Sequence, residues 1–88
     1  YPNPFNPTTQ IRFSLPNVST VSLVVYNILG QRIATLASGL AAAGEHVVTW
    51  NGRDQAGRAV SSGVYFYRLQ ATGSEGTFTN IKKMLLLK

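Results

Sequence analysis

The chain has 88 residues, which make one domain. It is 44% hydrophobic and 12% charged, a composition of globular rather than disordered proteins, and no apolar run is long enough to cross a bilayer as a helix. It has no cysteine, which excludes disulfides and thiolate metal sites. The net charge of +5 comes from few acids and scattered basic residues, a pattern more typical of a solvated surface than of a nucleic-acid footprint.

The opening of the chain is rich in proline, with Pro2, Pro4 and Pro7. Proline fixes φ and holds the preceding residue in extended geometry. We therefore expect residues 1–9 to form a stiff lead-in packed on the domain, and residues 10–88 to form a single β-sandwich. The chain begins at Tyr1 rather than at a methionine, so we expect a piece of a longer protein or a processed product.

The first half of the chain predicts three strands. Residues 10–15 alternate apolar and polar side chains, which is typical of a half-buried strand. Residues 20–29 are rich in β-branched side chains and apolar on both faces, which predicts a central strand. After a tight turn at Gly30, residues 32–36 predict a short strand at an edge or with a bulge. We expect residues 37–44 to be a loop, because three alanines cannot nucleate a helix there.

The second half predicts three more strands, at residues 45–50, 63–71 and 77–87, with a turn-rich connection between the first two. Short strands separated by Gly, Pro and Asn turns, without a helical period, indicate an all-β sandwich. Trp50 closes an alternating run, so we expect it to be buried beside Tyr65 or Tyr67.

The sequence offers little material for catalysis. Glu45 and His46 are neighbours in a predicted strand and therefore point to opposite faces. Asp54 lies in a turn-rich segment, where an Asx turn or a charge pair with Arg53 or Arg58 is the ordinary explanation. A lone histidine cannot form a metal site, and the glycines match no phosphate loop. We expect no enzyme, no metal and no cofactor.

The last strand has two apolar rows among its lysines. Lys82, Met84 and Leu86 lie on one face, and Lys83, Leu85 and Leu87 on the other. One interpretation is a central strand that is covered on both faces; the other is a recognition tail with one row exposed. The first is favoured here, because an exposed leucine row on an edge promotes aggregation.

Several segments, taken in order, resemble one family. They are YPNPFNPTT at the start, VYNILGQ at 25–31, GRDQAGRAVSSGVYFYRL at 52–69 and KKMLLLK at 82–88. Their order and spacing resemble the type A C-terminal sorting domain of the type IX (Por) secretion system. The middle block is also similar to the immunoglobulin-like domain of flagellar hook-capping proteins.

The sorting-domain resemblance implies an immunoglobulin-like antiparallel sandwich of about seven strands. It implies a non-catalytic sorting and anchoring module for an N-terminal cargo domain, secreted or held at the cell surface after crossing the periplasm of a Gram-negative bacterium. Its partners would be translocon and sortase-like components of the outer membrane, with no nucleic acid and no small-molecule substrate. The partner-recognition positions carried over are Gly63, Tyr65, Lys82, Lys83, Leu86, Leu87 and Lys88.

Two other hypotheses remain open from the sequence. The chain could be a structural β-sandwich, retained as a subunit or docking domain in a surface filament or large complex. It could also be a carbohydrate-binding module, although most aromatic residues alternate within strands as core residues do. An exposed Trp50 would favour the carbohydrate-binding module.

Overall fold

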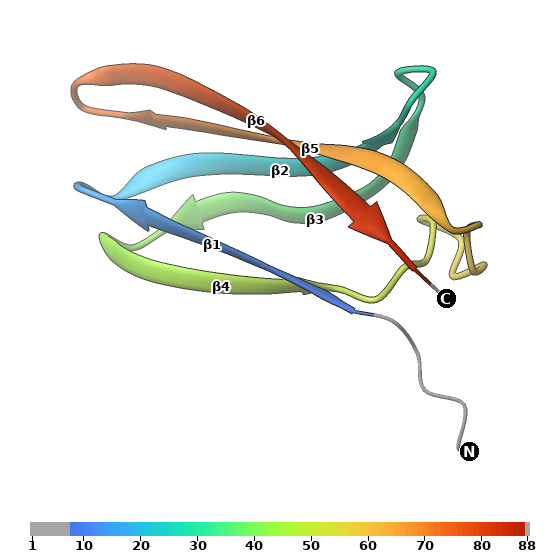
Figure 1. Ribbon diagram of the computed structural model, residues 1–88. Helices are drawn as coiled ribbons and strands as arrows, with labels where there is room; N and C mark the ends of the chain where they lie inside the picture. The colour runs from blue at the N-terminus through green and yellow to red at the C-terminus, as the bar shows by residue number, and fades with distance from the viewer. Residues whose placement is uncertain (1–7, 88) are drawn as a thin grey trace.

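The computed structural model describes residues 8–87, which form antiparallel strands in two facing sheets (Figure 1). The prediction of an all-β immunoglobulin-like sandwich is confirmed, but the described part has six strands rather than about seven. They are β1 (Thr9–Leu15), β2 (Ser19–Asn27), β3 (Arg32–Ala41), β4 (Gly44–Trp50), β5 (Gly63–Gly73) and β6 (Gly76–Leu86). Over this range there is no helix that is long and apolar enough to cross a membrane.

One sheet contains β1 and β4, and the other has the order β3-β2-β5-β6. The central position predicted for the β-branched strand is confirmed, since β2 pairs with both β3 and β5. Val21, Leu23 and Val25 on one face of β2 enter the core, and Val24 on the other face is 2% exposed. Ile28, which the prediction placed in this strand, lies in the following turn instead.

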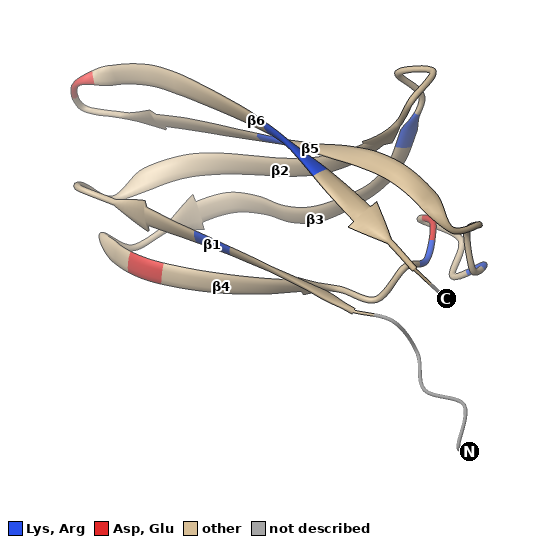
Figure 2. Cartoon of the chain, in the orientation of Figure 1, with Lys and Arg blue, Asp and Glu red and all other residues tan. Residues whose placement is uncertain are grey.

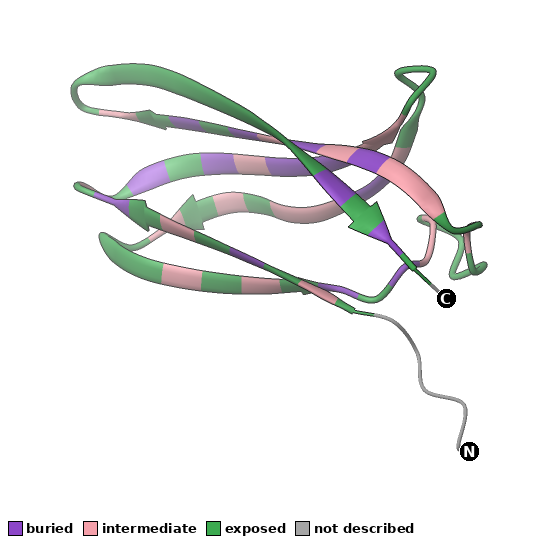
Figure 3. Ribbon diagram, in the orientation of Figure 1, coloured by how far each residue is buried: buried purple, intermediate pink, exposed green. Residues whose placement is uncertain are grey.

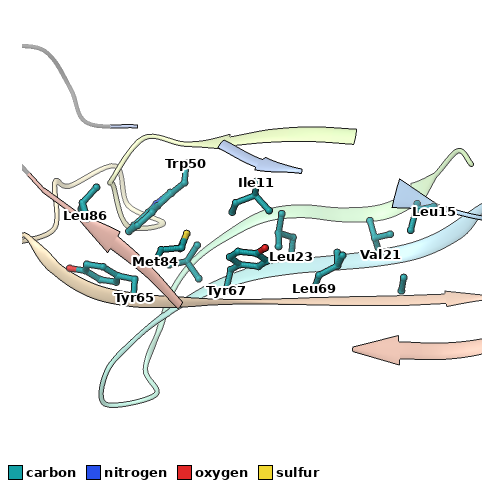
Figure 4. Close-up of a cluster of buried hydrophobic side chains, with 12 residues drawn as sticks. Ile11, Leu15, Val21, Leu23, Trp50, Tyr65, Tyr67, Leu69, Met84 and Leu86 are labelled. Carbon is teal, nitrogen blue, oxygen red and sulfur yellow. The ribbon is translucent and has the colours of Figure 1, made fainter. Parts of the chain in front are cut away.

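The core lies between the two sheets, and Trp50 is its largest fully buried side chain (Figure 4). Trp50 is 1% exposed, and its ring meets that of Tyr65 edge-on with centroids 5.1 Å apart. The predicted burial beside a tyrosine is therefore confirmed, and the neighbour is Tyr65. The exposed aromatic platform that a carbohydrate-binding module needs is not provided by Trp50.

The alanine-rich segment after Leu36 is a strand, so the prediction of a loop over residues 37–44 is wrong for most of its length. β3 continues through Ala41 and pairs with the start of β2, with Ser19 opposite Ala41 and Val21 opposite Gly39. Backbone pairing with a central strand outweighs the weak β-propensity of alanine and glycine. The prediction of a bulge or an edge position is confirmed, because β3 lies at the edge of the four-stranded sheet and its register against β2 shifts twice.

The last strand lies at an edge of its sheet, so the favoured interpretation of a strand covered on both faces is wrong (Figure 3). Met84 and Leu86 enter the core at 7% and 2% exposure, whereas Leu85 and Leu87 are 61% and 69% exposed. A two-stranded sheet faces a four-stranded one, so part of the larger sheet stays uncovered. Both rows of β6 are apolar in sequence, and the row that faces β1 and β4 across the core is the one that is buried.

The predicted lead-in overlaps the fold by one residue, because β1 already begins at Thr9. Residues 1–7, including the prolines, lie outside the described residues, so their packing on the domain stays a prediction. Apart from β3, each strand begins and ends within two residues of the position expected from the sequence.

Candidate protein-binding surface

The residues that usually carry chemistry have structural partners. His46 stacks on Phe13 with ring centroids 5.1 Å apart, and its Nε2 lies 2.7 Å from the carbonyl oxygen of Ala42. Within residues 8–87, no group of three or more His, Cys, Asp or Glu side chains is placed to hold a metal ion.

The connection between β4 and β5 (residues 51–62) is organised around Asp54. Its Oδ1 accepts hydrogen bonds from the backbone N–H groups of Ala56 (3.0 Å) and Arg58 (2.9 Å), and its Oδ2 lies 3.2 Å from Arg58 Nε. The Arg58 backbone N–H is the main cause that lowers the pKa of Asp54 below its ordinary value, and the guanidinium charge adds to it. Both explanations predicted for Asp54 are confirmed: it forms an Asx turn and an ion pair with Arg58. Gly57 has φ of 87°, a conformation that favours glycine.

This connection is fixed to the rest of the sandwich at both ends. Trp50 Nε1–H donates to the carbonyl oxygen of Arg53 at 3.0 Å, and the Tyr65 hydroxyl donates to that of Ser61 at 2.7 Å. Between these points Gln55 reaches β3: its N–H donates to the Ile33 carbonyl (2.9 Å), and its Oε1 accepts from the Thr35 N–H (2.8 Å). The loop therefore covers part of the outer edge of β3.

The turn between β2 and β3 presents two large apolar side chains to solvent. Asn27 organises this turn, because its Oδ1 accepts the N–H groups of Leu29 and Gln31, each at 3.0 Å. Gly30 follows with φ of 78°. Ile28 and Leu29 are left 69% and 77% exposed on a well-defined backbone, which lowers the entropy cost of using them as contacts.

A shallow depression of about 320 Å³ lies beside this turn. Residues from the β2–β3 turn and from the start of β5 line it: Asn27, Ile28, Leu29, Ser61, Ser62, Gly63, Val64 and Tyr65. Two predicted recognition positions, Gly63 and Tyr65, thus border a surface hollow. Because the hollow is shallow and Ile28 and Leu29 beside it are exposed, it is better suited to contact with a protein surface than to enclosing a small molecule.

The structure separates the predicted recognition residues into three groups. Tyr65 and Leu86 are buried in the core at 5% and 2% exposure. Gly63 is half-buried, whereas Lys82, Lys83 and Leu87 are exposed on or just after β6. Lys88 lies outside the described residues. A recognition role for these positions stays a prediction, and the exposed ones lie together on the last strand.

Sequence reasoning missed several exposed apolar residues that belong to these surfaces. On β6 they are Phe78 and Ile81, at 45% and 61% exposure, and in the β2–β3 turn they are Ile28 and Leu29. The spacing of Asn27 and Gly30 signals a tight turn, and that signal could have placed Ile28 and Leu29 outside the strand. Nothing local in the sequence signals the exposure of Ile81, since it depends on the edge position of β6.

Comparison with known proteins identifies relatives of this sandwich. The family model described as the FlgD Ig-like domain matches residues 4–75. FlgD from P. aeruginosa is similar in structure, with a TM-score of 0.70 and 26% identity over 90% of this chain and 61% of that one. FlgD from Xanthomonas campestris, studied for the hook capping essential for flagellar assembly, has a TM-score of 0.68 and 21% identity over 92% of this chain and 55% of that one.

The present chain therefore spans about three fifths or less of the FlgD chains that it matches. A search of curated proteins found no match.

These findings correct the functional expectation drawn from the sequence. The family model and both structures are those of FlgD, so the expectation of a type IX sorting module with translocon and sortase-like partners is wrong. The opening prolines and the closing lysine-flanked run, which favoured the sorting domain, are short motifs at the two ends of the chain. The similarity noted for the middle block was the sounder guide: the chain belongs to the FlgD Ig-like domain family.

Proposed function

We propose that the chain is a non-catalytic structural module that docks protein subunits in a flagellar hook-capping assembly. The observation that carries this proposal is the family match over residues 4–75. The likeness to the P. aeruginosa FlgD, at 26% identity over 90% of the chain, supports it. This proposal corresponds to the structural-module alternative that the sequence left open.

The described surface supports a docking role over a catalytic one. Asp54 and His46 serve local structure through the loop hydrogen bonds and the Phe13 stack. Exposed apolar side chains lie at the β2–β3 turn and on β6, and two exposed lysines accompany them on β6. Exposed apolar side chains that lie close together mark protein contacts, and no cofactor is part of the proposal. Because a flagellar hook lies outside the cell, we propose an extracellular location.

The test is a deletion in the bacterium that encodes the chain. The codons for residues 8–87 are removed in frame, and hooks are examined by electron microscopy. We expect hooks to be short or absent, and a control with Ser14→Ala, an exposed position on β1, to form normal hooks. Normal hooks in the deletion strain would refute the flagellar role. A hydrolase activity of the purified chain that Asp54→Asn abolishes would refute the non-catalytic role.

A further inference from the structure

The free edge of β6 is long and regular. β6 contains 11 residues and pairs with β5 along its whole length, from Gly63 opposite Leu86 to Gly73 opposite Gly76, without a register shift. Its other side pairs with no strand among residues 8–87. A strand in this position presents a row of unpaired backbone N–H and C=O groups, which is a template for a further strand.

Two lysines of β6 have no acidic residue beside them along the strand. Lys82 and Lys83 are exposed, and neither forms an ion pair within the part of the chain that the structure describes. Figure 2 shows no acidic residue on β6; the nearest one along the chain, Glu75, lies in the β5–β6 turn. At the rise of a strand, Glu75 is roughly 23 Å from Lys82. The positive charge of the edge is therefore locally uncompensated.

These lysines disfavour pairing between two copies of the chain. In the antiparallel register that overlaps all of β6, Ile81 lies opposite Ile81 of the second copy, and the two Lys82 side chains become diagonal neighbours on one face. In a parallel in-register pair, each lysine lies beside the same lysine of the second copy. Like charges at such positions are destabilising. The lysines therefore disfavour pairing of β6 with β6 of a second copy, while the backbone groups of the edge remain available to another strand.

The same charges favour a strand that carries acidic residues. Because Lys82 and Lys83 are adjacent, one points to each face of the sheet, and a partner meets both with two adjacent acidic residues. Ile81 and Leu85, each 61% exposed, share the outer face with Lys83 and offer apolar contacts on either side of it. The complementary strand thus has an acidic pair in the middle and apolar residues opposite Ile81 and Leu85.

We infer that the edge of β6 binds an extended acidic segment of a partner protein by antiparallel strand addition. Main-chain hydrogen bonds would supply affinity, and the lysines would set specificity and register. This inference rests on the geometry and charge of β6 and is independent of the flagellar assignment. It can therefore hold or fail whatever the hook experiment shows.

The test uses the full chain and three capped peptides. The probe is Thr-Val-Thr-Glu-Glu-Val-Thr-Thr; one control replaces both glutamates by lysine, and the other replaces the second valine by proline, which removes a backbone donor. Binding is followed by the amide NMR shifts of the chain. We expect shifts centred on residues 79–85, and an affinity for the glutamate peptide about tenfold higher than for the lysine peptide at low salt.

A pair of charge-matched variants separates local recognition from net charge. Lys82→Glu with Lys83→Glu should reverse the preference, so that the lysine peptide binds more tightly. Arg12→Glu with Arg32→Glu changes the net charge equally, but at exposed positions on β1 and β3, and should leave the preference for glutamate intact. Trp50 fluorescence checks that each variant is folded.

Three results would overturn the inference. They are equal binding of the glutamate and lysine peptides, undiminished binding of the proline peptide, and an absence of shifts on β6 at millimolar peptide. Shifts confined to the hollow beside Ile28 and Leu29 would identify that surface as the binding site instead. Concentration-dependent self-association of the unmodified chain through β6, measured by sedimentation, would show that the lysines do not prevent self-pairing.

Discussion

The four-stranded sheet has two edges, β3 and β6, that are protected in different ways. The register of β3 against β2 shifts twice, and Gln55 from the β4–β5 connection satisfies backbone groups of Ile33 and Thr35. β6 has an unbroken register, no covering loop among residues 8–87, and only Lys82 and Lys83 as charged groups. One edge is covered in part by a loop, and the other is uncovered within residues 8–87 and carries two lysines that disfavour self-pairing.

This difference separates a structural region of the molecule from an interaction region. A loop can cover an edge strand only if the loop itself is held in place. The Asp54 turn and the hydrogen bond of the Trp50 side chain hold residues 51–62 beside β3 in this way. Lys82 and Lys83 disfavour pairing of β6 with a second copy, but they leave its backbone groups available to a partner of opposite charge. The two edges should therefore respond independently to substitution.

The largest expected effect is the loss of stability when Trp50, which anchors the loop beside β3, is truncated. Trp50→Ala removes a side chain that is 1% exposed, together with its hydrogen bond to the Arg53 carbonyl. Truncating a buried tryptophan costs about 3–5 kcal/mol, much of the stability of a small domain. Urea unfolding followed by far-UV circular dichroism measures this loss.

Trp50→Phe is the matched control, because it keeps an aromatic ring in the core but lacks the indole N–H. We expect a smaller loss of stability, with faster hydrogen exchange around residues 53–55 and unchanged exchange on β6. If Trp50→Ala left the free energy of unfolding almost unchanged, the core described here would be wrong.

The second effect compares the two rows of β6. Leu86→Ala empties a position that is 2% exposed and should cost about 2–5 kcal/mol. Leu85→Ala changes a neighbour that is 61% exposed and should stay within about 0.5 kcal/mol. Thermal unfolding of the two variants gives the comparison directly, and similar losses for both would mean that both faces of the strand are covered.

These two leucines also show how far the sequence could lead. Alternation placed Leu85 and Leu86 on opposite faces, and the fold class and most strands followed from the same rule together with turn residues. The choice of the buried row depends on which face of the four-stranded sheet meets β1 and β4, which is a long-range property. The same reason explains β3, whose alanines form a strand because β2 lies beside them.

Fewer features of the surface than of the core could be predicted from the sequence. Burial of Trp50 and the turn at Asp54 follow from local patterns. The edge position of β6 and the contact of Gln55 with β3 join residues about twenty or more positions apart. Short terminal motifs were a poor guide to the family, because they carry less information than the long middle block.

A moderate effect is expected when the cover of β3 is removed. Gln55→Ala deletes the acceptor of the Thr35 N–H, and a typical hydrogen bond contributes about 0.5–1.5 kcal/mol. Exchange of the Thr35 amide should accelerate, whereas that of β6 should not change. Gln55→Glu keeps an oxygen acceptor and should preserve the protection. Unaltered exchange at Thr35 in the alanine variant would show that Gln55 does not close this edge.

The smallest effect concerns the pH dependence of the loop that covers β3. The pKa of Asp54 is lowered in the folded chain, chiefly by the backbone N–H of Arg58. A carboxyl group whose folded pKa lies below its unfolded value stabilises the fold when ionised, so its contribution is present above the ordinary pKa of about 3.9 and is lost as the pH falls through the lowered folded value. Because the side chain is partly exposed, this contribution is modest.

Asp54→Asn is neutral at every pH and isolates this contribution. We expect the variant to be slightly less stable than the parent chain at neutral pH, and the difference to disappear in acid, where the parent carboxyl is protonated. Urea unfolding across the acidic range measures the difference, and Glu45→Gln, at an exposed acid on β4, is the control. A difference that grows as the pH falls has the wrong sign and would mean that ionised Asp54 does not stabilise the loop. A constant difference would assign the effect to the altered hydrogen bonds alone, and β3 would then be closed without help from this charge.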